Sequence, residues 1–152
     1  FGNGGTDTLV NVERLQFSDV SVALDIEGTA GQAYRLYRAA FDRAPDKAGV
    51  GYWIKMMDQG MSLEQVAAGF TGSAEFASLY GANASDAQFV ELLYNNVLHR
   101  SAEGEGRDYW MEVLGEHHAP RQQVLAFFSE SAENQAQVIG SIQNGIEFTP
   151  WG

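Results

Sequence analysis

One pattern of residues occurs twice in this chain, and the repetition limits the folds that it can adopt. Each copy carries an aromatic helix segment that ends in arginine, then a glycine, then a Tyr-Trp pair. The matched positions are segment 37–43, Gly49 and Tyr52-Trp53 in the first copy, and segment 94–100, Gly106 and Tyr109-Trp110 in the second. All of them differ by 57 positions, the difference between Tyr94 and Tyr37. A constant offset of this kind indicates two copies of one supersecondary unit, and such units build scaffolds and binding surfaces.

The apolar residues of each copy have helical spacing. They recur at i, i+3, i+4, i+7 and i+8, which is one face of an amphipathic helix. They are Ala33, Leu36, Tyr37, Ala40 and Phe41 in the first copy, and Val90, Leu93, Tyr94, Val97 and Leu98 in the second. Later in the unit the offset becomes 58, because the second copy holds one extra residue in the loop 115–118. We therefore predict a mainly α fold of about eight helices in two pseudo-repeated units, about 30–80 and about 86–140, with a tail over 141–152.

Helix starts are marked by capping residues. Three Ser/Thr-x-x-Gln patterns predict capping boxes, in which the hydroxyl and the glutamine side chain each bond a backbone N–H. They begin at Thr29, Ser62 and Ser85. In the second helix of the first copy, Pro45 is predicted at the first helical position, where its missing N–H is harmless. Ser101 is the predicted cap of the counterpart helix.

The first 28 residues differ from the rest and form a separate predicted region, 1–28, before a helical domain over 29–152. Alternating apolar residues predict two short strands, 13–17 and 20–24, joined by a tight turn at Ser18-Asp19. An isolated hairpin is marginal in water. We therefore expect this one to pack on the helices or to continue a preceding sheet.

Charge and composition exclude several classes of function. The formal net charge is −11, which argues against binding nucleic acid or an anionic membrane through bulk electrostatics. There is no cysteine, so disulfide and thiol chemistry are absent. No apolar run approaches the roughly 20 residues that span a bilayer. The chain opens at Phe1 without a methionine, as expected of a segment of a longer protein.

The segment Gly4 to Leu9 resembles the degenerate end of an RTX nonapeptide array, a calcium-binding parallel β-roll. The resemblance implies calcium as a cofactor, with Asp7 and Asp19 as candidate ligands. Each calcium in such a roll is shared between successive turns, so this segment alone is expected to bind calcium weakly. The alternative is a plain loop and hairpin.

The helical body resembles an all-helical domain of unknown function found in secreted bacterial RTX, haemolysin-type and adhesin-like proteins, and distantly the phycobilisome linker domain. The resemblance rests on Phe41 to Gly49 with Tyr52-Trp53, on Phe70 to Phe76, and on their counterparts in the second copy. The second copy departs at Ser101-Ala102, where the family tends to have Ala-Pro. The resemblance implies a secreted or cell-surface bacterial protein and transfers no catalytic residue. The end of the chain, acidic to neutral with aromatic residues, also resembles type I secretion signals.

Four residues are candidate ligand contacts. Arg43 and Arg100 end equivalent helices, where an arginine can clamp a carboxylate or an acidic sugar, or can bond helix carbonyls and an acidic first turn. Tyr52 and Tyr109 offer aromatic faces to a sugar or peptide. Adjacent helical residues point about 100° apart, so we expect the neighbouring tryptophans in the core and these tyrosines partly exposed.

The sequence shows no nucleophile elbow, phosphate loop or paired carboxylates, so we expect no enzyme activity. His117-His118 lack metal-ligand spacing and are read as turn residues. The leading hypothesis is a non-catalytic C-terminal module of a secreted, calcium-dependent surface protein that serves β-roll capping, secretion, anchoring or interaction. Its partner would be a cell-surface or matrix glycan or protein. The alternatives are a lectin-like module for carbohydrate or peptide and an accessory region of a secreted hydrolase.

Overall fold

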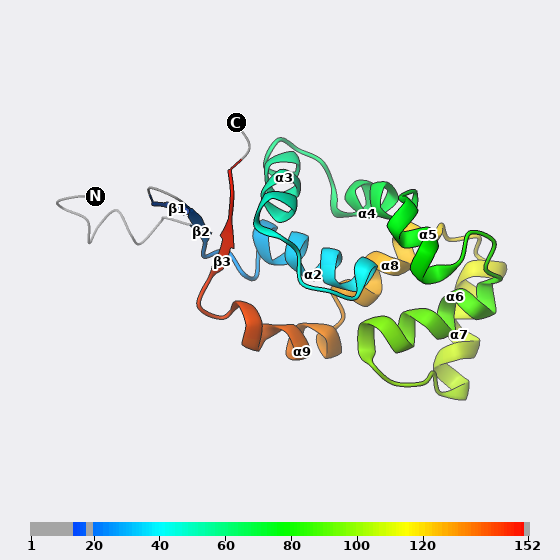
Figure 1. Cartoon of the computed structure of the whole chain (residues 1–152). Helices are drawn as coiled ribbons and strands as arrows, with labels where there is room; N and C mark the ends of the chain where they lie inside the picture. Colours follow the sequence, from blue (N-terminus) through cyan, green and yellow to red (C-terminus); the bar gives the residue numbers. More distant parts are fainter. Residues whose placement is uncertain (1–13, 18–19, 151–152) are drawn as a thin grey trace.

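The computed structural model describes residues 14–17 and 20–150, and within them the fold is mainly α-helical (Figure 1). Eight α-helices and one π-helix lie in this part of the chain. They are α2 (Thr29–Phe41), α3 (Lys47–Asp58), α4 (Leu63–Thr71), α5 (Ala74–Tyr80), α6 (Asp86–Leu93), η1 (Tyr94–Leu98), α7 (Gly104–Gly115), α8 (Arg121–Ser129) and α9 (Ala132–Ile142). The predicted mainly α fold with a short N-terminal hairpin is confirmed.

The hairpin belongs to a small three-stranded sheet. Strands β1 (Arg14–Gln16) and β2 (Ser21–Ala23) pair antiparallel, and β2 also pairs antiparallel with β3 (Ile146–Phe148). The sequence did not predict β3, because a three-residue apolar alternation is too short to separate from a packed tail. Pairing with β3 brings the two ends of the described chain together, which Figure 1 shows at one end of the molecule. The hairpin is thus supported by tertiary contacts, as its marginal intrinsic stability requires.

Two of the three predicted capping boxes are confirmed. Ser62 and Ser85 each accept from the backbone N–H three residues later, and the glutamine there accepts from the backbone N–H of the serine. The box predicted at Thr29 is wrong, because helix α2 already includes that residue and its N-cap is Gly28. Asp25 supplies the missing acceptor, with its carboxylate 3.0 Å from the N–H of Ala30.

The predicted starts of the second helix of each copy are also wrong. Helix α3 begins at Lys47, and Asp46 is its N-cap, accepting from the N–H of Gly49. Pro45 therefore lies before the helix. In the second copy the N-cap is Glu103, which makes no side-chain cap, so Ser101 lies two residues too early. In both copies the helix begins two residues later than predicted, at Lys47 and at Gly104.

The two copies have equivalent aromatic cores. Tyr37 and Trp53 both pack against Phe70, with ring centroids 5.5 Å and 4.9 Å away. Their counterparts pack against Phe128, at 5.2 Å for Tyr94 and 5.1 Å for Trp110. The residues that end the first helix of each copy, Asp42 and His99, share a left-handed backbone with φ of 51° and 58°. The predicted pseudo-repeat is confirmed at the level of side-chain packing.

The copies differ in what covers their second helix. Strand β3 and the residue after it lie against α3, where the N–H of Thr149 donates to Lys47 O at 2.9 Å. The buried face of α3 consists of Val50, Gly51 and Ile54. The positions that match the first two of these in α7 are Arg107 and Asp108, which are exposed. A polar outer face on the second copy is typical of the end of a repeat array.

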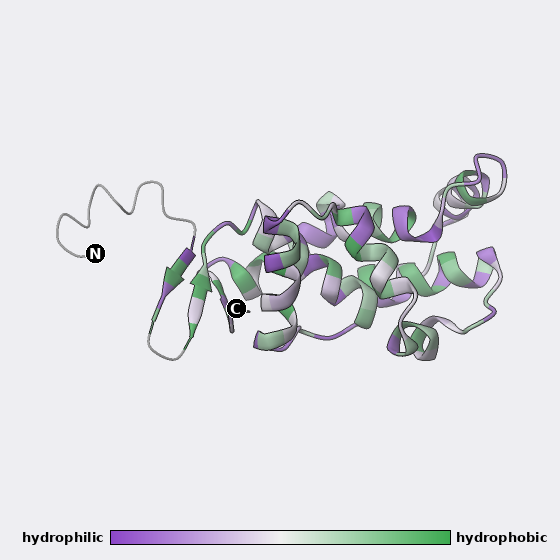
Figure 2. Ribbon diagram, turned by 90° about the horizontal axis from the view of Figure 1, so that it is seen from above, coloured by the Kyte–Doolittle hydropathy of each residue, from purple (hydrophilic) through white to green (hydrophobic). Residues whose placement is uncertain are grey.

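Helix α2 lies at the centre of the helical body, among helices of both copies (Figure 1). Apolar residues recur along each helix between polar ones, so that every helix has one face for the core (Figure 2). Arg35 of α2 is buried, with 4% of its surface exposed. Its guanidinium donates to both carboxylate oxygens of Glu130, at 2.8 and 2.7 Å, and to Ile26 O at 2.8 Å.

Replacing either of two helical glycines, Gly51 or Gly140, by alanine is expected to change stability in opposite directions. A Cβ at Gly51 would lie 2.0 Å from Thr149 O, whereas a Cβ at Gly140 would meet nothing within 4 Å. We expect Gly51→Ala to destabilise the protein by about 2 kcal/mol or more by displacing the chain after β3. Gly140→Ala should stabilise it by about 0.5 to 1 kcal/mol through helix propensity. Urea melts of both variants measure this, and equal effects would contradict the packing of residue 149 on α3.

The tryptophans are half-buried at the edge of the core rather than enclosed in it, which corrects the expectation that both are core residues. Trp53 contacts both apolar clusters of the protein, whereas Trp110 contacts one. Full burial makes Trp→Ala cost about 3–5 kcal/mol, so we expect about 2 to 3 kcal/mol for Trp53→Ala and about 1 to 2 for Trp110→Ala. Thermal and urea unfolding should rank the two variants in that order, and the reverse order would contradict these environments.

Candidate functional site

Arg43 and Arg100 occupy equivalent ion pairs. The guanidinium of Arg43 donates to both carboxylate oxygens of Glu75 at 2.9 and 3.1 Å. Arg100 does the same with Glu133 at 2.8 and 3.0 Å. Each guanidinium also lies 5.1 Å from the ring centroid of the tyrosine that begins the repeated pattern. The two carboxylates lie in the first turns of α5 and α9, the last helix of each copy, so each arginine pairs with an acidic first turn, as its scaffold interpretation requires.

These pairs fix the protonation states of their members. Hydrogen bonds from Arg43 hold the pKa of Glu75 below its usual range, and Arg100 does the same for the pKa of Glu133. Both glutamates are therefore ionised at neutral pH. A ligand carboxylate would have to displace Glu75 or Glu133 to reach either arginine. Binding of a ligand carboxylate by Arg43 or Arg100 stays a prediction, and it would require breaking the existing ion pair.

The two Tyr-Trp pairs have the same geometry and different exposure. Their rings meet edge to face at 4.9 Å, with interplanar angles of 81° for the first pair and 79° for the second. Tyr52 is half-buried, whereas 59% of the surface of Tyr109 is exposed. The structure therefore places one of the two predicted tyrosines on an open surface.

Next to Tyr109, a shallow groove of about 590 Å³ runs between the start of α4 and helices α7 and α8. We call it the aromatic groove. Its apolar wall consists of Leu63, Trp110, Ala126 and Phe127, and its polar wall of Glu64, Gln123, Glu130 and Ser131. Rings offer flat faces for stacking, and the carboxylate of Glu64 and the amide of Gln123 offer hydrogen bonds. The Glu130 carboxylate and the Ser131 hydroxyl are already bonded within the protein. The groove thus combines the two kinds of contact that fix a sugar ring or a peptide.

Phe127 is the residue that distinguishes this groove from the first copy. Its counterpart at the 58-residue offset is Gly69, where a Cβ would lie 3.3 Å from the ring of Trp53. Phe127 is 57% exposed, and its ring lies 6.1 Å from that of Trp110. Phe127 does not stand alone: it neighbours Trp110, which in turn neighbours the exposed Tyr109, and exposed apolar patches mark interaction sites. Sequence comparison of the two copies could have found it, since glycine and phenylalanine stand at matched positions.

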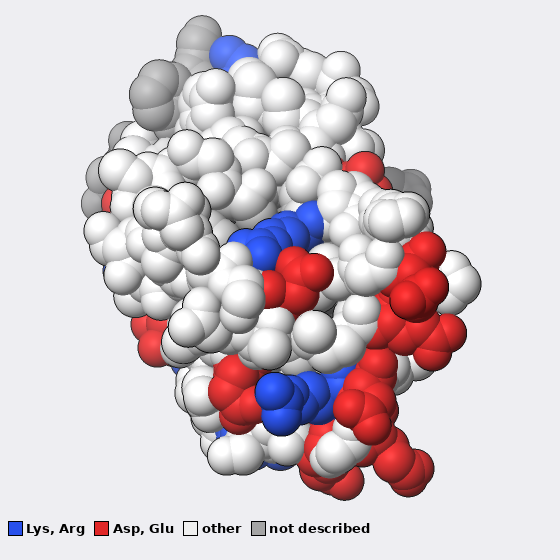
Figure 3. Space-filling view, turned by 90° about the vertical axis from the view of Figure 1, so that its right-hand side faces the viewer, with Lys and Arg blue, Asp and Glu red and all other residues white. Residues whose placement is uncertain are grey.

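The end of the molecule that carries α6 and α7 is acidic. Segment 103–116 contains five acidic residues and one arginine. Figure 3 looks at this end and shows Asp and Glu gathered along one edge, with few Lys or Arg between them. Such a surface repels nucleic acid and anionic polymers.

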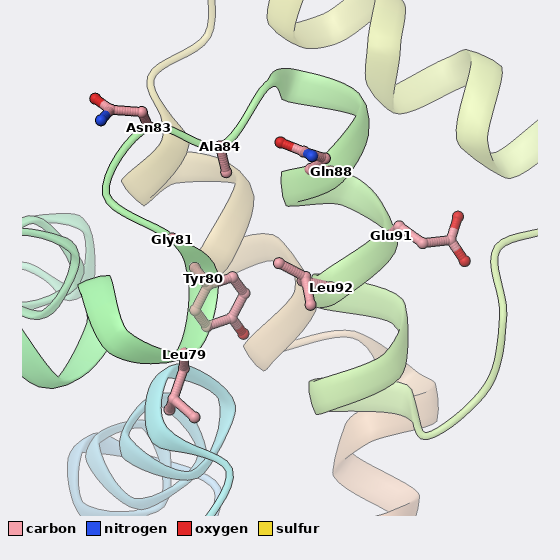
Figure 4. Close-up of a pocket in the computed structure, with 8 residues that line it drawn as sticks. All are labelled: Leu79, Tyr80, Gly81, Asn83, Ala84, Gln88, Glu91 and Leu92. Atoms are coloured by element: carbon pink, nitrogen blue, oxygen red, sulfur yellow. The ribbon is translucent and has the colours of Figure 1, made fainter.

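A second depression, of about 550 Å³, lies between the end of α5 and the start of α6 (Figure 4). Leu92 and the ring of Tyr80 line it, and the carboxylate of Glu91 points away from it. The Tyr80 hydroxyl donates to Ala39 O at 3.1 Å, and burial raises its pKa well above the ordinary value. This hydroxyl is therefore a structural donor and no acid–base group at neutral pH.

The metal-site predictions fall on two parts of the chain. Asp7 and Asp19, the candidate calcium ligands, lie outside the described residues. In the described ranges, no group of three or more His, Asp or Glu side chains is placed to hold a metal ion. His117 is exposed, with Nε2 3.5 Å from a Glu112 oxygen, and His118 adopts a left-handed turn conformation, as expected of turn residues.

Comparison with known proteins places the helical body in a family. The model of a domain of unknown function, DUF4214, matches residues 30–79 and again residues 67–138. No curated protein and no solved structure matches the chain. Within residues 14–17 and 20–150, no helix has the length and apolar character needed to cross a bilayer. The two matches together span both copies of the repeat, and the chain belongs to the DUF4214 family of domains of unknown function.

Proposed function

We propose that this chain is a non-catalytic binding module of a secreted bacterial surface protein, and that it contacts glycans through the aromatic groove. The exposed Phe127 carries the proposal, because the matched position of the first copy holds Gly69 and needs no ring. With Trp110 it forms part of the apolar wall of the groove, beside hydrogen-bonding groups, and Tyr109 packs edge to face on Trp110. That arrangement suits a sugar ring, whose apolar face stacks while its hydroxyls bond amides and carboxylates.

The wider role follows from the sequence resemblance. A module next to the end of a calcium-loaded β-roll would cap the roll and display the groove at the bacterial surface, which supports adhesion or anchoring. The acidic end around α7 favours a neutral glycan over a polyanionic one, because like charges repel at short range. A peptide ligand is the alternative occupant, and the same groove would receive its apolar side chains.

Replacing Phe127 by glycine, the residue at the matched position 69 of the first copy, tests the aromatic groove as a binding site. We expect the protein to bind neutral glycans on an array, and Phe127→Gly to reduce that signal about tenfold, since loss of an aromatic contact of about 1.4 kcal/mol lowers affinity by that factor. Ile139→Ala is the matched control, since Ile139 is also an exposed apolar residue, at 40%, and does not line the groove. An unchanged signal in Phe127→Gly, or an equal loss in Ile139→Ala, would remove the groove from the proposal.

The calcium hypothesis is tested by amide exchange with and without calcium. We expect calcium to slow exchange in the region before Gly28, and Asp7→Ala to abolish that response, because its carboxylate would be a ligand. Asp108→Ala, on the exposed face of α7, should leave the response unchanged. The helical body should stay folded in chelator, since apolar clusters and ion pairs hold it. Global unfolding in chelator would place calcium inside the helices, and no response would reduce segment 1–28 to a plain hairpin.

A further inference from the structure

The two copies of the repeat differ sharply at one internal position. In the first copy, α5 places Phe76 and Tyr80 in a stacked pair, with ring centroids 4.1 Å apart and planes 8° apart. Helix α9 is the counterpart of α5 at an offset of 58 residues. It carries Asn134 and Val138 where α5 carries these two rings. The second copy has thus exchanged a buried aromatic stack for smaller side chains, one of them polar.

A small polar pocket occupies the space that this exchange leaves. Its volume is about 170 Å³, and it lies where α2, η1 and α9 meet, between the two copies. We call it the inter-repeat pocket. Its apolar lining is Ala39, Val97 and Val138, and its polar lining is Arg38, Asp42, Asn96, His99, Asn134 and Gln137. The Asn134 amide donates to Ser129 O at 2.8 Å, which satisfies its own buried polar group. The exchange still replaces an aromatic stack by smaller side chains and gathers polar groups, as expected where a ligand binds.

Arg38 is the group that suggests the ligand. It lies in the last turn of α2 and is half-buried, and its guanidinium has no hydrogen bond or ion pair with any described residue. The other half-buried or buried arginines of the described chain have acidic partners; these are Arg14, Arg35, Arg100 and Arg121. A guanidinium presents its donors in a planar fork that matches the two oxygens of a carboxylate. The free fork of Arg38 therefore selects an anionic, planar group.

The remaining polar groups of the pocket suit hydroxyls. His99 is held at the rim, with Nδ1 3.0 Å from a Gln137 oxygen and Nε2 3.5 Å from an Asp42 oxygen. The Asp42 carboxylate accepts hydrogen bonds, and the amides of Asn96 and Gln137 can both donate and accept. Pockets for drug-sized ligands measure about 300–1,000 Å³, so this one holds a smaller molecule. From these contacts we propose that the inter-repeat pocket binds a carboxylate-bearing monosaccharide, with its carboxylate on Arg38 and its hydroxyls toward Asp42, Asn96 and Gln137.

Titration calorimetry with glucuronate tests this assignment. We expect saturable binding in the millimolar range, with glucose and acetate each at least about tenfold weaker, because each lacks one half of the recognised group. Glutamate, which carries a carboxylate without the sugar hydroxyls, should also be weaker. Equal affinity for glucose would overturn the carboxylate contact, and equal affinity for acetate or glutamate would overturn the sugar contacts. Absence of saturable glucuronate binding would overturn the proposal as a whole.

Variants locate the binding at this pocket. Arg38→Gln should weaken glucuronate binding about tenfold or more while leaving the melting temperature unchanged, since Arg38 has no partner to lose. Gln137→Leu gives α9 the residue found at the matched position of α5 and should weaken binding several-fold without unfolding the chain, because Gln137 is exposed. Arg107→Gln is the control, since Arg107 is an exposed arginine of α7 outside the pocket. Retention of full affinity in Arg38→Gln would overturn the proposal. The aromatic groove is a separate site, so Phe127→Gly should leave glucuronate binding intact.

Discussion

A buried ion pair joins the two copies of the repeat, whose helices also share one apolar core. Arg35 lies in the central helix α2 and Glu130 at the end of α8, 95 residues later. Only 5% of the arginine side chain and 22% of the glutamate side chain are exposed. A buried guanidinium is tolerated only when its donors are satisfied, and here Glu130 and Ile26 O accept from it. The start of the first copy and the last third of the second are therefore held in one arrangement, on which the groove and the pocket both depend.

This ion pair has no counterpart at the repeat offset. The positions that match Arg35 and Glu130 are Leu92 and Gly72, which cannot form an ion pair. By contrast, the pairs Arg43–Glu75 and Arg100–Glu133 occur in both copies and hold each unit together internally. These ion pairs within a unit occur in duplicate, whereas the Arg35–Glu130 pair between the units occurs once.

Both candidate sites lie where the second copy departs from the first. Phe127 stands in place of Gly69 and opens an aromatic platform, and Asn134 stands in place of Phe76 beside a polar pocket. In a structural repeat, one copy can be compared with the other, and residues that both copies share are explained by packing. We assign binding to positions where the second copy carries a residue that this shared packing does not need. The candidate residues predicted from the sequence, Arg43, Arg100, Tyr52 and Tyr109, occur in both copies. Residues that occur in both copies of a repeat usually serve its packing.

The helical class, the two copies and their aromatic cores could be predicted from local patterns of residues. Helical spacing of apolar residues and serine caps are local signals, so Tyr37, Tyr94 and the boxes at Ser62 and Ser85 could be placed without coordinates. The start of α2 was misplaced because its cap, Asp25, precedes the helix by several residues and acts through a turn. The pairing of β3 with β2, the partner of Arg35, the exposure of Phe127 and the unpaired guanidinium of Arg38 became known only from the folded chain. These features arise from contacts between residues far apart in the chain, and no local pattern encodes which distant side chain will satisfy a charge or leave a ring uncovered.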